Sequence, residues 1–140
     1  MKHIHSHGST KANQNLAKSA INWYVSKYLP NIRKIDIKLQ FSNLEETLRG
    51  RCTQNSKREY LIEINETLHK DEMISTVMHE MIHVKQYVLN EMSDMNNGSV
   101  RWKKQVINPE NIDYAEHPWE KEAFAYEEIL ACAFEVDFGI

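Results

Sequence analysis

The sequence predicts an α+β fold, with an N-terminal helix, a small three-stranded sheet, a second helix, a flap and a C-terminal helix. Apolar residues recur at helical spacing over residues 16–28 and 71–92. They alternate with polar residues over 35–41 and 59–65, which is typical of half-buried strands. A third helical pattern, opened by a proline, covers 118–136. A chain of 140 residues can bury such a core as one domain without disulfides.

Each element has a local reason. The first helix ends before Pro30, which cannot continue a helix. The first strand places its apolar residues on one face, namely Ile35, Ile37, Leu39 and Phe41. A weaker strand is expected over 48–53, and a polar turn leads from it to the third strand at 59–65. Asp71 is expected to cap the second helix.

The ends and the middle of the chain carry weaker patterns. Residues 1–12 are expected to be a disordered expression tag, because their polar sequence contains alternate histidines, His3, His5 and His7. We therefore expect one domain at 13–140 and exclude these histidines from the active site. Residues 93–117 are expected to form a flexible flap beside a cleft, with a short strand or hairpin arm that carries Trp102.

Composition excludes several classes of protein. The net charge of −3 gives no argument for a general nucleic-acid or membrane partner. No apolar run approaches the ~20 residues of a membrane span. Cys52 and Cys132 form no C-x-x-C unit and are expected to be buried, reduced thiols, as in a cytoplasmic protein. We expect a cytoplasmic monomer.

The strongest chemical signal is His79-Glu80-Met81-Ile82-His83 within the second helix. Two histidines four positions apart project from one face of a helix, so both imidazoles can bind one tetrahedral zinc ion. Glu80, beside the first histidine, is placed to hold a metal-bound water. The opposite face of the helix is apolar and anchors it in the core.

A third protein ligand is expected from the last helix. On a helical wheel Glu122 shares a face with apolar residues, Trp119, Tyr126, Ile129, Leu130 and Ala133. A carboxylate buried there is costly unless it pairs with a cation, and a zinc held by His79 and His83 would satisfy it. We therefore predict Glu122 as the third ligand. Glu120, which the helix phase directs towards solvent, and His117, which precedes the helix, remain alternatives.

These two motifs resemble those of compact zinc metallopeptidases called gluzincins, which carry H-E-x-x-H on one helix and a glutamate on a later helix. Residues 79–87 followed by 118–123 are similar to small metallopeptidases of bacteriophages and prophages. The gluzincin pattern Glu-x-x-Ala matches residues 122–125, but 120–123 fit it as well.

The order of helix, three strands and metal helix is also similar to the SprT-like minimal protease core, over about residues 14–134. SprT-like proteins use a third histidine, so the chain departs from them unless His117 is the ligand.

The expected activity is hydrolysis of peptide bonds in a protein or peptide substrate, with Glu80 as general base. Tyr87, Tyr114 and Tyr126 are candidates to stabilise the oxyanion. If residues 59–65 form the sheet edge beside the zinc, an extended peptide can pair with that strand.

Two other functions stay open: a zinc-stabilised binding module without turnover, and a SprT-like protease acting on DNA-bound proteins. The second function needs a basic patch, and its candidate residues are Arg49, Arg51, Lys57, Arg58, Arg101, Lys103 and Lys104.

Overall fold

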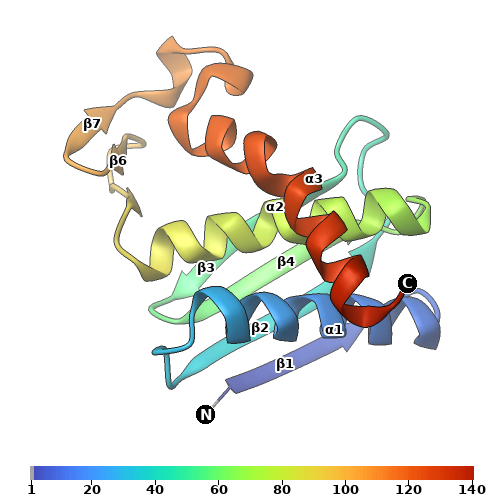
Figure 1. Cartoon of the computed structure of the whole chain (residues 1–140). Coiled ribbons are helices and arrows are strands. Elements are labelled where there is room, and N and C mark those ends of the chain that lie inside the picture. Colours follow the sequence, from blue (N-terminus) through green and yellow to red (C-terminus); the bar gives the residue numbers. More distant parts are fainter. Residues whose placement is uncertain (1) are drawn as a thin grey trace.

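The computed structural model describes residues 2–140, which form three long helices and two sheets (Figure 1). The predicted α+β class is confirmed. In chain order the elements are β1 (Lys2–His7), α1 (Lys11–Tyr28), β2 (Ile35–Ser42), β3 (Gly50–Ser56), β4 (Glu59–Asn65), α2 (Lys70–Val88), β5 (Met92–Asp94), β6 (Val100–Trp102), β7 (Gln105–Ile107), the 3-10 helices η1 (Pro109–Asn111) and η2 (Tyr114–Glu116), and α3 (Pro118–Phe138).

The larger sheet has four strands in the order β1-β2-β4-β3. β1, β2 and β4 run parallel to one another, and β3 pairs antiparallel with β4. In β2 the even alternation of the sequence is matched by burial, since every second side chain faces the core. This order puts β3 at one edge of the sheet, so β4 (Glu59–Asn65), which was considered as the edge strand, lies inside it.

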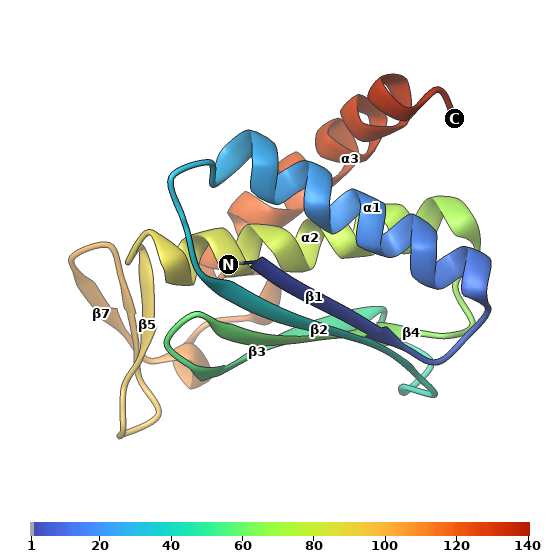
Figure 2. The ribbon, with the colours of Figure 1, turned by 90° about the horizontal axis from the view of Figure 1, so that it is seen from below.

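Helices α1 and α2 lie side by side on one face of the larger sheet (Figure 2). Their apolar sides and the inner face of β2 and β4 form the main core. α3 lies outside α2 and crosses it, as Figure 1 shows. α2 is therefore covered by neighbours on several sides, which explains why polar residues on it, including both motif histidines, are buried.

The N-terminal segment differs from the expected disorder. Residues 2–7 form β1, paired in parallel with β2 from Lys2↔Ile35 to His7↔Gln40. Strand pairing uses backbone groups, so an edge strand can form from polar residues that show no hydrophobic pattern. Thr10 then caps α1, because its hydroxyl accepts a hydrogen bond from the Asn13 backbone N–H at 3.1 Å.

Residues 93–117 contain more regular structure than a loop. β5, β6 and β7 form a small antiparallel sheet at one end of α2, and Trp102 lies on β6 as expected for a hairpin arm. A second apolar cluster fixes this sheet to the start of α3: Met92, Val100, Trp102 and Trp119. The two 3-10 helices η1 and η2 then lead into α3.

Three smaller expectations can be compared with the structure. The N-cap position of α2 is His69, and Asp71 lies within the first turn, so the predicted cap is wrong. Both cysteines are free thiols, but Cys132 is exposed and Cys52 is partly exposed. Over residues 2–140, none of the helices combines the length and the apolar character needed to cross a membrane.

Candidate metal centre

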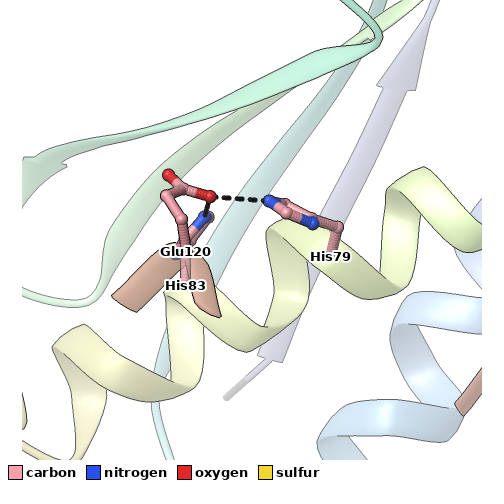
Figure 3. A group of neighbouring side chains, drawn as sticks. All are labelled: His79, His83 and Glu120. Carbon is pink, nitrogen blue, oxygen red and sulfur yellow. Dashed lines mark hydrogen bonds and ion pairs between the residues drawn. The ribbon is translucent and has the colours of Figure 1, made fainter. Parts of the chain in front are cut away.

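α2 places its two motif histidines side by side in the interior. His79 and His83 are 5% and 6% exposed, and their ring centroids lie 5.0 Å apart. One helical turn separates them, so both rings project in the same direction from α2 (Figure 3). Glu80, next to His79, is also buried and borders the adjoining cleft. The predicted arrangement of these three residues on one helix is thus present.

The acid that meets these histidines is Glu120, in the first turn of α3. Its Oε1 lies 2.9 Å from Nε2 of His79 and 3.1 Å from Nε2 of His83 (Figure 3). The ligand atoms of the three side chains all lie within 4.8 Å of one another. Two imidazole nitrogens and one carboxylate oxygen, all buried, form a group that could hold a metal ion.

Glu122 lies elsewhere, so its predicted placement facing the histidines is wrong. Its Oε1 accepts hydrogen bonds from Nζ of Lys85 at 2.8 Å and from Nε2 of Gln86 at 3.1 Å. The alternative ligand His117 also lies outside the group. Its Nε2 contacts the backbone carbonyl oxygens of Pro109 and Ile112 at 3.0 and 3.1 Å.

The error came from the phase assigned to α3. The apolar residues that defined the expected inner face include Tyr126 and Ile129, which are 52% and 62% exposed. The face that is buried includes two acids, Glu120, which was expected to face solvent, and Glu127. A helical wheel assigns the buried face from apolar residues alone. It therefore cannot identify a face that is buried through the partners of its carboxylates.

Each histidine is oriented by a partner at its other ring nitrogen. Nδ1 of His79 lies 2.9 Å from Oε1 of Glu127, and Nδ1 of His83 lies 2.8 Å from Oε1 of Gln86. A carboxylate or amide oxygen only accepts hydrogen bonds, so each Nδ1 carries the proton that it donates. When a ring loses its second proton, as it must to bind a metal, its lone pair is on Nε2, the nitrogen that faces Glu120.

Glu127 and Gln86, the partners of the two histidines, are themselves fixed by further hydrogen bonds. Arg49, just before β3, contacts both carboxylate oxygens of Glu127 at 3.2 and 3.0 Å. Gln86 donates from Nε2 to the backbone oxygen of Trp119 at 3.0 Å and to Glu122. Sequence reasoning assigned no role to Gln86 or Glu127. Their spacing gave a signal, since Gln86 follows His83 by three positions and Glu127 follows Glu120 by seven.

Without a metal, the site is a buried network of charges. Burial opposes the charged form of His79, but hydrogen bonds to Glu120 and Glu127 outweigh burial and raise its pKa to about 9. Burial likewise disfavours ionised Glu120, yet its hydrogen bonds with His79 and His83 lower its pKa to about 2. A carboxylate that stays ionised between two imidazoles is well suited to share a divalent cation with them.

Glu80 has a different environment. Burial raises its pKa to about 7, although the nearby His83 and His79 favour its charged form. A carboxyl group with a pKa near neutrality can both accept and return a proton at physiological pH. The cleft beside Glu80 therefore holds a group with the properties of a general base.

The cleft has two compartments, and Glu80 borders both. The first has a volume of about 250 Å³ and borders His83 and Glu120, and the second has about 130 Å³ and borders His79. Both share a set of bordering residues, Leu48, Gly50, Glu80 and Tyr114.

Gly50 lets the start of β3 approach α2 closely. A Cβ atom at this position would lie 2.7 Å from Cγ2 of Thr76 and 2.8 Å from the backbone oxygen of Glu63, so a larger residue would displace the strand. The edge strand β3 therefore begins directly beside the helix that carries Glu80.

The three tyrosines considered for the oxyanion have different surroundings. The Tyr87 hydroxyl donates to Oδ2 of Asp94 at 3.0 Å. Tyr126 lines a separate groove between α1, α2 and α3. Tyr114 borders both compartments of the cleft, and burial together with the charges of Glu120 and Glu80 raises the pKa of its hydroxyl.

Comparison with known proteins identifies one family. No curated protein and no solved structure matches the chain. The model of the SprT-like family matches residues 17–112, a range that contains His79, Glu80 and His83 and ends before α3. Because this match covers more than half of its 140 residues, the chain belongs to the SprT-like family.

Proposed function

We propose that this protein is a zinc metallopeptidase in which His79, His83 and Glu120 bind the metal and Glu80 is the general base. The observation that carries the proposal is the position of the Glu120 carboxylate between the Nε2 atoms of the two histidines. Both rings are already oriented by hydrogen bonds at Nδ1. Membership of the SprT-like family supports a protease-type function. Zinc is the ion that best suits two imidazoles and one carboxylate with an open fourth position.

Each residue has a distinct task in this proposal. A bound zinc would keep one position for a water molecule and lower the pKa of that water towards 7. Glu80 takes one proton from the attacking water and later delivers it to the amine nitrogen that leaves. Glu127 and Gln86 keep the two rings in the tautomer that leaves Nε2 free.

The substrate in this proposal is an extended segment of polypeptide. β3 is an edge strand, and its first residue, Gly50, borders both compartments of the cleft. A peptide that pairs with the free edge of β3 places its backbone along the cleft beside Glu80. Because two compartments border Glu80, the cleft offers space for more than one side chain of the substrate, which suits an endopeptidase.

The direct test is metal analysis together with cleavage of an unfolded protein such as casein. We expect about one zinc per chain and slow cleavage that a chelator stops. His3, His5 and His7 should be replaced by serine for this test, because they lie exposed on β1 and removing the whole segment would delete a strand. Loss of zinc in this triple variant would contradict the proposal.

A protein bound to DNA is an alternative substrate that is consistent with membership of the SprT-like family. Two of the basic residues that could serve such a role already have acidic partners, since Arg49 pairs with Glu127 and Arg51 with Glu63. A cleavage rate that rises when DNA is added would favour this substrate. A rate that does not change would leave the plain peptidase as the function.

A binding module without turnover is the remaining alternative. Such a site needs no general base, and its metal normally has four protein ligands. Glu80 borders an open cleft instead, and within residues 2–140 three ligand atoms converge at the site. Equal behaviour of the wild-type protein and Glu80→Gln in every assay would favour the module.

A further inference from the structure

Tyr114 is the feature of the cleft to which the proposed function gives no task. It lies in η2, ahead of α3, and like Glu80 it borders both compartments. Glu120 borders the first compartment beside it. The side chain is 58% exposed overall, so a substrate in the cleft can reach it.

The loop that carries Tyr114 is held in place by neighbouring residues. The imidazole of His117 bonds through Nε2 to the carbonyl oxygens of Pro109 and Ile112, which closes the loop on itself. His117 also stacks on Trp119, with 4.8 Å between ring centroids. His117 is therefore a support for this loop, and this explains why a histidine near the site is buried without facing the metal group.

The ring of Tyr114 is positioned by two edge-on contacts. Its centroid lies 5.8 Å from that of His117 and 6.4 Å from that of Phe124 on α3. Phe124 in turn packs against His79 at 4.7 Å. The phenol is thus connected through aromatic contacts to the metal group, and its direction is set before a substrate arrives.

Two other hydrogen-bond donors at the cleft, Tyr87 and Arg49, are already engaged. The Tyr87 hydroxyl is bound to Asp94, and the guanidinium of Arg49 contacts both oxygens of Glu127. The Tyr114 hydroxyl itself interacts with the carboxylate of Glu120, one of the three grouped ligands. A metal ion held by Glu120 would compete for that carboxylate, and we expect this competition to release the hydroxyl. Tyr114 then has a donor free for the substrate.

We propose that Tyr114 is a catalytic residue that donates a hydrogen bond to the carbonyl oxygen of the peptide bond being cleaved. This proposal rests on the proposed function. The water oxygen bonds to the carbonyl carbon, one water proton passes to Glu80, and the carbonyl π electrons move to the oxygen, where the Tyr114 hydroxyl stabilises the negative charge.

The second half of the reaction returns these electrons. The carbonyl forms again, the C–N bond breaks with its electron pair on nitrogen, and Glu80 gives its proton to that nitrogen. The second water proton leaves the new carboxyl group, which ionises at neutral pH. Tyr114 keeps its own proton throughout, so its task is electrostatic.

The test compares Tyr114→Phe with Tyr126→Phe in the zinc-loaded full chain, with casein and then a peptide that contains a mapped cleavage site. Phenylalanine keeps the ring contacts with His117 and Phe124 and removes only the hydroxyl. We expect kcat to fall by about 10²–10³-fold in Tyr114→Phe, the loss typical of one oxyanion donor. KM and zinc content should stay unchanged. Tyr126→Phe should match the wild type, since Tyr126 lines a separate groove.

A second measurement distinguishes catalysis from substrate binding. A phosphinic analogue of the cleaved peptide resembles the tetrahedral state, so Tyr114→Phe should bind it more weakly by about the same factor as the loss in kcat/KM. Binding of the intact peptide to Glu80→Gln should not change when Tyr114→Phe is added. A raised KM with normal kcat would overturn the catalytic role.

The two proposals fail in different ways. An active wild-type enzyme whose Tyr114→Phe variant keeps its kcat refutes the role of Tyr114 alone. A zinc-loaded wild type that cleaves neither casein nor any peptide refutes the proposed function, and the role of Tyr114 with it.

Discussion

Glu120 and Glu122 are two positions apart on α3 and have opposite surroundings. Glu120 meets two imidazoles, and its side chain is 8% exposed. Glu122 meets Lys85 and Gln86, and its side chain is 22% exposed. Two positions on a helix are about 200° apart, so the two carboxylates reach different sides of α2. The phase of α3 thus decides which of the two acids faces the metal group.

The two acids are nevertheless connected. Gln86 accepts a hydrogen bond from Nδ1 of His83 and donates one to Glu122. Glu122 therefore supports His83 indirectly, through the Gln86 side chain at Nδ1, whereas Glu120 contacts Nε2 of the same ring. Position in the hydrogen-bond network, more than burial alone, thus distinguishes Glu120, the proposed ligand, from Glu122.

The largest expected effect separates the base from the ligands. Glu80→Gln should lower kcat by about 10²–10⁴-fold, because the amide cannot accept the proton of the water. Its zinc content should equal that of the wild type, since Glu80 is not among the three grouped ligands. Zinc analysis and casein cleavage, measured on the same sample, check both statements. Zinc lost from Glu80→Gln would show that the roles are assigned wrongly.

The variants Glu120→Ala and Glu122→Ala, measured side by side, test whether the two acids contribute differently to zinc affinity. Removal of Glu120 takes away one of three ligand groups, so zinc affinity should fall by more than the ~100-fold typical of an outer partner. Removal of Glu122 should change the affinity by less than about threefold, because Gln86 still bonds to the backbone of Trp119. Competition with a chelating dye gives both affinities. Equal losses in the two variants would break the distinction.

A smaller effect is expected for the partner of His79. Glu127→Gln replaces the carboxylate that orients Nδ1 of His79 and should lower zinc affinity by about 10–100-fold. Glu135→Gln, on the same helix and outside this network, is the matched control. The absorption spectrum of the cobalt-substituted protein should also shift in Glu127→Gln, because the ring is held differently. An affinity equal to that of the control would remove Glu127 from the site.

The smallest expected effect concerns stability. Burial opposes the charge of Glu122, but hydrogen bonds from Lys85 and Gln86 outweigh it and lower its pKa. This stabilisation is present above the unfolded pKa near 4.5 and is lost as pH falls through the lowered folded pKa. Glu122→Gln should therefore cost about 1 kcal/mol of unfolding free energy at pH 7 and nothing at low pH. Urea unfolding of the metal-free protein at both pH values measures this difference, and a cost that persists at low pH would contradict the ion pair.

Local patterns in the sequence predicted much of the fold. β4 was predicted with its observed bounds, because Tyr60, Ile62 and Ile64 alternate with polar residues and bury one face. The motif on α2 and the start of α3 at Pro118 were also read correctly. These features depend on neighbours within one turn or one strand, so the local sequence contains the information.

What the sequence did not predict depends on contacts between distant segments. β1 is stabilised by backbone pairing with β2. Such pairing does not require alternating apolar residues, so the sequence of β1 shows no hydrophobic period. The inner face of α3 is polar where it meets His79 and His83, so its apolar residues gave the wrong phase. Arg49 could not be assigned to Glu127 without the crossing of α3 over α2. The residues of the candidate metal centre are thus the ones for which hydrophobic periodicity is the poorest guide.

The most direct test of the central claim is a crystal structure of the zinc-loaded protein with anomalous diffraction measured at the zinc edge. We expect one strong peak bonded to Nε2 of His79, Nε2 of His83 and a carboxylate oxygen of Glu120 at about 2.0–2.2 Å. Glu122 should remain on Lys85. A zinc ion bonded to Glu122 or His117, or a peak away from the two histidines of α2, would contradict this account.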